Sequence, residues 1–411
     1  MRIKSISISL SPNTQKDDIW LAFKLLFQPW TWKRGAATLA LEQAFARYIG
    51  TELAYSFNSG RSALMAILSS LSLQKGDEVL LQAFTCNAVP NPVLWAGLKP
   101  VYVDCREDDF NIDPVDLERK ITPRSKVVIV QHTFGLPADM DRIMEICKRR
   151  SLILVEDCAH TLGATYRGKK VGTFGKAAFF SFSRDKVISC VYGGMATTND
   201  PALAERLERF QETIGYPSLF WVKQQLLHPV VMNMKILPFY ALGGKYVLVL
   251  AQWLHILSKA VHWREKRGKI PGYFPRRLPN ALAILALHQL QKLEKFNAHS
   301  KELARYYASK LQGTSFMLPQ DFTERGNIFL RFVLRHPRAH EIIRKAWNRN
   351  LLLGDWYTSP VAPHDTQLDA VGYTIGSCPV AEKLSQETLN LPTHIRISKK
   401  EADVIIRFLK V

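Results

Sequence analysis

Cysteine, acidic residues and long hydrophobic runs are all scarce in this chain of 411 residues. The six cysteines have no paired Cys-x-x-Cys spacing, so we expect neither disulfides nor a zinc site. Reduced thiols in a cytoplasm are expected instead. No uncharged run reaches the roughly 18 residues of a membrane-spanning helix. The start, MRIKSISISLSPNTQKDD, lacks the apolar core of a signal peptide. We therefore expect a cytoplasmic globular protein that holds no metal.

Lysine and arginine outnumber the acidic residues by 55 to 36, which gives a formal net charge of +19. Such an excess implies an anionic partner. The candidates are a phosphorylated substrate, a membrane surface and a nucleic acid. The basic residues are scattered through apolar sequence, and no recognised nucleic-acid-binding module accompanies them. We therefore expect no nucleic-acid partner.

Short apolar runs alternate with helical patterns over the first half of the chain. Such alternation predicts an α/β domain with a largely parallel sheet. The expected strands cover residues 78–81, 100–103, 126–131, 152–155 and 177–182. A smaller α+β domain is expected after residue 277, built from one long helix that ends near Gly313, a strand at 327–334 and helices at 340–348 and 401–411.

These changes of pattern divide the chain into four parts. They are an amphipathic aromatic and basic segment (1–34), a large domain (35–215), an apolar basic insert (216–277) and a long helix with a small domain (278–411).

The first segment and the insert share an unusual composition. Six of the nine tryptophans lie in them, and the insert holds ten lysines and arginines against one acid, Glu265. Residues 11–34 are expected to form an amphipathic helix with an aromatic end. Aromatic and basic side chains that flank apolar stretches are typical of a helix in the interface of a bilayer. The alternative is that these helices bury one another or a dimer contact.

An acid and a lysine stand out within residues 152–200. Asp157 follows an apolar strand, and ligands in an open parallel sheet sit beyond the carboxyl ends of strands. Ser181 and Lys186 follow the next strand, so both groups are expected at one rim. A carboxylate that keeps a pyridine nitrogen protonated and a lysine that forms a Schiff base are what a pyridoxal phosphate enzyme requires. Upstream, Gly60 stands at a helix amino terminus, where free amides attract phosphate.

Several motifs, in order, resemble those of the DegT/StrS-type sugar aminotransferases, which are pyridoxal phosphate enzymes of the aspartate aminotransferase (type I) fold. The likeness is dense from residue 35 to about residue 200, looser from 278 to 411, and poor over the insert. The matching stretches are NSGRSALMAILSSLSLQKGDEVLLQAFTCNAVPNPVLWAGLKPVYVD, FNIDPVDLERKITPRSKVVIVQHTFGLPADMD, VEDCAHTLGATYRGKKVGTFGKAAFFSFSRDK and GGMATTND.

The resemblance implies a role for each matching residue. Lys186 corresponds to the catalytic Schiff-base lysine, and because family members that act as sugar dehydratases have histidine there, the lysine predicts transamination. Asp157 corresponds to the acid that bonds the pyridine nitrogen. The implied cofactor-binding set is Gly60, Arg61, Cys86, Asp157, His160, Ser181 and Lys186.

Three of the positions near the expected cofactor depart from the family pattern. Cys86 stands where an aromatic residue often stacks on the ring, a role that His160 or Phe84 would have to take. Arg61 replaces a threonine and would add a cation beside the phosphate. Tyr192 replaces a glutamate.

A fourth departure lies at Pro275, near an asparagine that members supply to the phosphate of the partner subunit. In place of that asparagine, Arg276 and Arg277 are candidates for binding an anion. The anion would be either the cofactor or a nucleotide diphosphate. His132, in the family's HxxG pattern, is expected to help shape the site.

The resemblance implies an aminotransferase that moves an amino group from an amino acid, expected to be L-glutamate, to a keto sugar, expected to be nucleotide-linked, in polysaccharide or amino-sugar biosynthesis. A homodimer is expected, and an anionic membrane surface at the inner face of the cell membrane is a further expected partner. The alternative is a pyridoxal phosphate-binding protein that regulates or scaffolds without catalysis.

Overall fold

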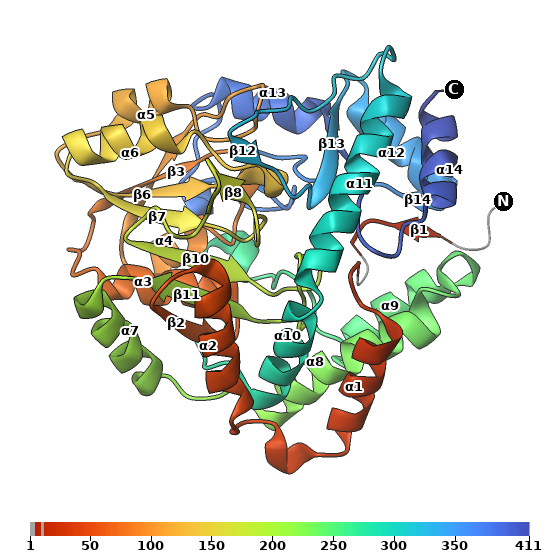
Figure 1. Cartoon of the computed structure of the whole chain (residues 1–411), viewed down its shortest axis with the longest axis horizontal. Coiled ribbons are helices and arrows are strands. Elements are labelled where there is room, and N and C mark those ends of the chain that lie inside the picture. Colours follow the sequence, from red (N-terminus) through yellow and green to blue (C-terminus); the bar gives the residue numbers. More distant parts are fainter. Residues whose placement is uncertain (1–4, 10–11, 411) are drawn as a thin grey trace.

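A seven-stranded sheet organises the amino-terminal half of the molecule (Figure 1). The computed structural model describes residues 5–9 and 12–410. All five expected strands are present in the sheet, so the prediction of an α/β class is confirmed. In spatial order the strands are β2 (Leu53–Phe57), β11 (Gly194–Thr198), β10 (Ala177–Ser181), β7 (Ile153–Asp157), β6 (Ser125–Gln131), β3 (Glu78–Gln82) and β5 (Lys99–Val103).

The sheet is mostly parallel, because only β11 runs against its two neighbours, β10 and β2. Alternate side chains of β6 enter two different cores. Val127 and Ile129 pack on one side, and Val128 and Val130 pack on the other. Burial of both faces is typical of parallel strands and explains why the strands read as continuous apolar runs in the sequence.

The register of the sheet brings polar residues to one edge. Asp157, the last residue of β7, is opposite Gln131 on β6 and Phe179 on β10. The helix α3 (Gly60–Ser70) contacts β10 and β11 and begins at the same edge. This edge therefore collects the carboxyl ends of three strands and the amino terminus of a helix.

The expected long helix is two helices, α10 (Asn280–Leu290) and α11 (Leu293–Leu311). The break falls at Lys292, whose Nζ donates to Asp17 at 2.8 Å and to Asp18 at 2.7 Å. Both acids belong to α1 (Lys16–Leu26), so a tertiary contact holds the break. Apolar periodicity continues across it, and the sequence prediction was wrong for that reason.

The smaller carboxyl-terminal part contains an antiparallel pair, β13 (Arg331–Arg335) with β16 (Thr388–Pro392), and the helices α12 (Ala339–Asn348) and α14 (Lys399–Leu409). The expected strand at 327–334 begins four residues too early, because Asn327 instead accepts a hydrogen bond from the backbone of Phe329 through its side chain. Val411, in the expected last helix, lies outside the described residues.

The first segment is only partly the expected helix. Its α1 ends at Leu26, and Trp30 lies in the short turn η1 (Pro29–Thr31), where Trp30 is exposed while Trp32 is buried. Ser11, at the start of the expected helix, lies outside the described residues.

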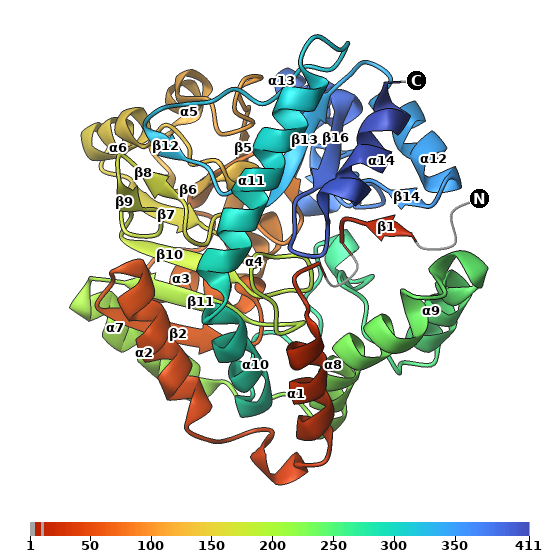
Figure 2. The same ribbon diagram turned by 45° about the vertical axis from the view of Figure 1, so that its right-hand side comes forward.

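The insert folds mainly as α8 (Leu219–Val231), the π-helical turn η3 (Met232–Ile236) and α9 (Gly244–Trp253). Figures 1 and 2 show α1, α8 and α9 together on one side of the molecule, and α1 packs on α8. Among the described residues, none of the helices has both the length and the apolar character needed to cross a membrane.

Candidate active site

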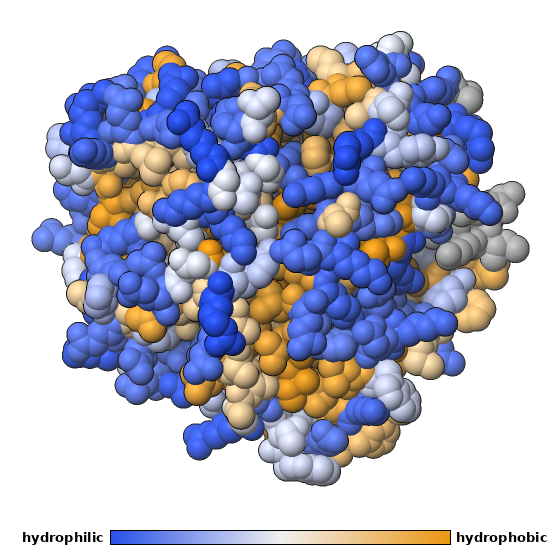
Figure 3. Space-filling model, in the orientation of Figure 1, coloured by the Kyte–Doolittle hydropathy of each residue, from blue (hydrophilic) through white to orange (hydrophobic). Residues whose placement is uncertain are grey.

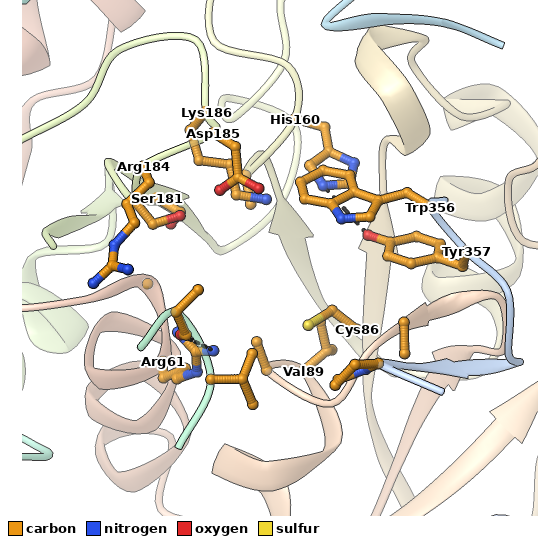
Figure 4. A pocket seen from close by; sticks show the side chains of 18 of the residues that line it. Arg61, Cys86, Val89, His160, Ser181, Arg184, Asp185, Lys186, Trp356 and Tyr357 are labelled. Carbon is orange, nitrogen blue, oxygen red and sulfur yellow. Dashed lines mark hydrogen bonds between the residues drawn. The ribbon is translucent and has the colours of Figure 1, made fainter. Parts of the chain in front are cut away.

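A cavity of about 200 Å³ lies at the edge where the strands end (Figure 4). Its wall includes Gln131, Asp157 and Phe179 from the ends of three neighbouring strands. Residues 183–186 form a second wall, and residues 355–358 of the carboxyl-terminal part form a third. The residues expected from the sequence to bind a cofactor all line this cavity: Gly60, Arg61, Cys86, Asp157, His160, Ser181 and Lys186.

Asp157 is a buried residue of the cavity wall, with 3% of its surface exposed. Burial raises the pKa of its carboxyl to about 6, although a hydrogen bond from the Ala159 amide and the nearby charge of Lys186 act in the opposite direction. A carboxyl of this pKa is mostly ionised at neutral pH, and an adjacent cation would stabilise the ionised form further.

Lys186 reaches the cavity from the loop after β10. Its Nζ lies 4.7 Å from the centroid of the Trp356 ring. Burial lowers the pKa of this amine below its usual value, while Asp185 opposes the shift. A lowered pKa increases the fraction of neutral amine, which is the form that attacks a carbonyl or accepts a proton.

The amino terminus of α3 faces the cavity next to the end of β10. Ser59 caps the helix by accepting a hydrogen bond from the Ser62 amide at 3.0 Å. A Cβ atom on Gly60 would lie 3.1 Å from the Cβ of Ser181, so the glycine allows the helix and the strand to touch. The free amides of the first turn and the Ser181 hydroxyl therefore meet at one place, which suits a phosphate.

His160 is part of an aromatic stack over the cavity (Figure 4). Its ring stacks on Trp356, with centroids 5.2 Å apart and an interplanar angle of 18°. The Phe134 amide donates to Nδ1 at 3.3 Å, so Nε2 is the nitrogen that carries the proton, 3.4 Å from the Tyr357 hydroxyl. Burial, with the nearby charges of Lys186 and Arg331, holds the pKa of His160 well below its usual value and keeps the ring neutral.

Arg331 lies behind this stack, 3.3 Å from the centroid of the Trp356 ring. Its guanidinium is buried and lies 3.5 Å from Asp185, the residue before the lysine. Burial lowers the pKa of Arg331 to about 10, although Asp185 opposes the shift, so the side chain remains a cation at neutral pH. Arg331, Trp356 and Tyr357 were not predicted from the sequence. The adjacent Trp-Tyr pair was the available signal, but nothing local linked it to residues so much earlier in the chain.

Packing decides which residue can take the place of the missing aromatic. Cys86 lines the cavity as a half-buried thiol. Phe84 is fully buried against Phe110, Phe134 and Tyr357 and is not among the lining residues, so it does not replace that aromatic. Of the two alternatives, only His160 lies at the cavity.

The departures Arg61 and Tyr192 share one structural role, because both hold the end of the insert over the cavity. Arg61 forms a buried ion pair with Glu265. The Tyr192 hydroxyl donates to the carbonyl of Lys259 at 2.6 Å. Arg184 adds a hydrogen bond to the Ser258 hydroxyl at 2.6 Å. Residues 258–265, of which Ala260 and Val261 line the cavity, therefore form a wall of the site.

Arg61 is a cation whose counter-charge lies within the protein. Burial alone would lower the pKa of its guanidinium, but the Glu265 carboxylate holds that pKa above its usual value. The charge of Arg61 is therefore balanced within the protein by Glu265, a pairing that the sequence did not predict.

Three other expected residues do not line the cavity. The Arg277 guanidinium donates to the carbonyl of Gln211 at 2.6 Å, and the Arg276 guanidinium donates to the carbonyl of its neighbour Pro275 at 3.1 Å. His132 lies fully buried beneath the site, where Nε2 bonds Glu156 at 3.2 Å. Its backbone amide donates to the carbonyl of Asp157, so His132 supports the site without lining it.

The groups in the cavity fit pyridoxal phosphate. A carboxylate for the ring nitrogen, an amine for the aldehyde carbon and a helix amino terminus with a hydroxyl for the phosphate all face the same cavity. Each reactive part of the cofactor therefore has a side chain or an amide suited to it.

Comparisons with known proteins agree with this chemistry. The sequence profile of the DegT/DnrJ/EryC1/StrS aminotransferase family matches residues 13–410. The chain is 29% identical to GDP-perosamine synthase of Caulobacter vibrioides over 383 residues, which cover 92% of this chain and 91% of that protein. It is 30% identical to the erythromycin biosynthesis sensory transduction protein EryC1 of Saccharopolyspora erythraea over 378 residues, which cover 92% and 90%.

Solved structures show the same fold. DesV of S. venezuelae is 27% identical with a TM-score of 0.75, and the match covers 96% of this chain and 94% of that chain. The aminotransferase TlmJ from Streptoalloteichus hindustanus is 23% identical with a TM-score of 0.75 and coverage of 98% for both chains. The chain therefore belongs to the DegT/DnrJ/EryC1/StrS aminotransferase family and is a pyridoxal phosphate-dependent sugar aminotransferase.

Proposed function

We propose that this enzyme moves an amino group from L-glutamate to the ketone of a nucleotide-linked sugar in polysaccharide or amino-sugar biosynthesis. The observation that carries the proposal is the convergence of Asp157, Lys186 and the Gly60–Ser181 contact on one cavity. The relative from Caulobacter vibrioides is named GDP-perosamine synthase, which supports a nucleotide-linked substrate. The net charge of +19 favours an anionic substrate of this kind.

Asp157 and His160 have separate roles in the proposal. Pyridoxal phosphate, when bound, supplies a carbonyl carbon that amines attack and an aromatic ring that accepts electrons. Asp157, ionised above about pH 6, holds the proton on the ring nitrogen. His160 stacks on Trp356 and faces the substituents of the cofactor ring. Because its pKa lies well below the usual value, His160 stays neutral near neutral pH.

Lys186 is the catalytic residue of the proposal. With pyridoxal phosphate bound, the Lys186 Nζ would hold its aldehyde carbon until an amino substrate displaced the amine. The freed amine, with a pKa lowered by burial, would then move a proton from the α carbon of the amino donor to the C4′ carbon of the cofactor, and would carry a proton in the opposite direction, to the sugar carbon, in the second half-reaction.

Gly60, Arg61 and Ser181 form the phosphate end of the site in the proposal. The amides of the first turn of α3 and the Ser181 hydroxyl donate to the phosphate. Arg61 contributes through its amide and through the wall that it holds with Glu265, because its guanidinium is already paired. Cys86 faces the ring without stacking on it.

The proposal includes a homodimer in the cytoplasm, with a position at the inner face of the cell membrane. All six cysteines are free thiols, as expected in a reducing compartment. The likeness to family members over nearly the whole chain supports the dimer, which light scattering measures directly.

The test of the proposal is a pair of half-reactions. The absorbance spectrum of the pure protein should show a cofactor band that L-glutamate converts to the amine form, with release of 2-oxoglutarate. A panel of nucleotide-linked keto sugars should then restore the first spectrum, and the mass of the product identifies the sugar. A protein that binds cofactor but undergoes neither conversion would be a regulatory or scaffold protein, and the proposal would be abandoned.

A further inference from the structure

The insert presents an exposed apolar face that its own fold leaves without a partner. Of the 24 large hydrophobic side chains that are exposed among the described residues, fourteen lie between Leu219 and Ile270 and four more lie between Trp20 and Trp30. Figure 3 shows apolar side chains at the lower right of the molecule, where Figure 1 places α9. Such a concentration on a folded chain marks an interaction site.

The helix α9 has two apolar faces. One face carries Leu248 and Ala251, which pack on η3 in a small core with Met232 and Ile236. The opposite face is exposed. It carries four large side chains at helical spacing, with exposed fractions of 68, 64, 54 and 72%: Tyr246, Val249, Leu250 and Trp253. We call these four residues the α9 stripe.

Within the insert, the exposed charges that flank the α9 stripe along the chain are all of one sign. No aspartate or glutamate occurs from residue 213 to residue 264, and the next acid, Glu265, is fully buried against Arg61. The lysines of the same stretch are all exposed: Lys223, Lys235, Lys245 and Lys259. A second copy of the chain would bring these lysines together with no local carboxylate to pair with them, whereas an anionic surface would complement them.

We propose that the α9 stripe docks the enzyme on an anionic lipid bilayer, with α9 lying parallel to the surface. The aromatic rings of Tyr246 and Trp253 enter the headgroup region, Val249 and Leu250 enter the acyl boundary, and the lysines contact the lipid phosphates. This inference does not depend on which sugar is the substrate.

The same insert forms a wall of the active site. Five residues after Trp253 the chain reaches Ser258, where the hydrogen bonds of Arg184 and Tyr192 begin to hold residues 258–265 over the cavity. Docking through α9 therefore connects the lipid surface to the cavity wall through only five residues of chain, an arrangement suited to a membrane-delivered sugar or a sugar for membrane-bound glycans.

The experiment is flotation of the full-length protein with two kinds of vesicle, one of phosphatidylcholine alone and one of phosphatidylcholine and phosphatidylglycerol in equal parts. We expect flotation with the anionic vesicles, at least tenfold weaker flotation with the neutral ones, and release from the anionic vesicles by high salt, because salt screens the lysines. The double variant Leu250→Glu, Trp253→Glu should lose flotation at least tenfold.

Ile375→Glu is the matched control, because Ile375 is also highly exposed but lies outside the insert. It should float like the wild-type protein. Lipid-free aminotransferase activity should be equal in all three proteins, which keeps the result separate from the proposed function.

Wild-type protein that stays in the soluble fraction would overturn the proposal, as would a double variant that floats normally. A double variant that changes from dimer to monomer in light scattering, with no vesicle binding by either form, would assign the stripe to a dimer contact and would also overturn it.

Discussion

Arg61 and Glu265 form a buried ion pair that joins the first turn of the phosphate-facing helix to the wall supplied by the insert. Their side chains are 9% and 0% exposed. Arg61 also donates to the carbonyl of Ala260 and lies over the Phe274 ring. This contact attaches the insert to the cofactor site. Each of the two buried charges is stabilised by the opposite charge of its partner.

Removal of one member of this pair should be costly. Glu265→Gln leaves the Arg61 guanidinium buried without a counter-charge, and we expect a loss of about 3–5 kcal/mol in the free energy of unfolding. The double variant Arg61→Met, Glu265→Leu should lose less than Glu265→Gln alone, because it leaves no buried charge. Urea unfolding of the three proteins measures both quantities. A double variant that loses as much stability as Glu265→Gln, or more, would contradict the role of the pair.

Lys186→Ala should abolish the covalent link to the cofactor and slow the half-reaction with L-glutamate. Loss of proton transfer alone is expected to cost about 10²–10⁴-fold in rate. The rate of spectral conversion by L-glutamate measures the effect. Addition of a small primary amine such as methylamine should restore part of the rate in Lys186→Ala, whereas a variant that is inactive through misfolding would show no rescue.

Cofactor affinity should depend on pH through Asp157. The pKa of this carboxyl in the free protein is about 6, which lies above its ordinary value, so the group becomes neutral as pH falls through 6. The neutral form does not attract a protonated ring nitrogen. We therefore expect an affinity that is constant above about pH 6.5 and falls below pH 6, by up to about tenfold per pH unit.

Asp157→Asn is the reference for this titration. Its cofactor affinity should be weaker at neutral pH and should not share the decline below pH 6. A wild-type affinity that is flat between pH 5 and pH 7 would show that the carboxyl does not titrate in this range.

Ser181→Ala should weaken binding of the phosphorylated cofactor without affecting its unphosphorylated form. A hydrogen bond to a charged group contributes about 1.5–3 kcal/mol, which corresponds to roughly 10- to 150-fold in affinity. Spectroscopic titration of the apoprotein with pyridoxal phosphate and with pyridoxal separates the two. Equal losses for both ligands would place Ser181 away from the phosphate.

The sheet and its rim were predictable because their signals are local. Strands buried on both faces are read directly as apolar runs, and Asp157, Ser181 and Lys186 follow two of these runs within a few residues. In a mostly parallel sheet the carboxyl ends of neighbouring strands must meet, so order along the chain becomes proximity in space.

The third wall of the cavity was not predictable in this way. Trp356 and Tyr357 of the carboxyl-terminal part line it, Arg331 packs on Trp356, and their relation to His160 depends on how distant segments pack together. The break between α10 and α11 has the same origin. The acids that bond Lys292 at this break belong to α1, and they lie 275 and 274 positions earlier in the chain.

The sequence by itself determined the fold class, the strand-end acid, the lysine and the helix amino terminus that face one another, because each follows from a local pattern and from the geometry of parallel strands. The tertiary structure alone decided that Arg61 is neutralised by Glu265, that residues 258–265 wall the cavity, and that one face of α9 is left exposed. The physical reason is that burial and charge pairing depend on which distant segments pack together, and hydrophobic periodicity identifies an apolar face without identifying what covers it.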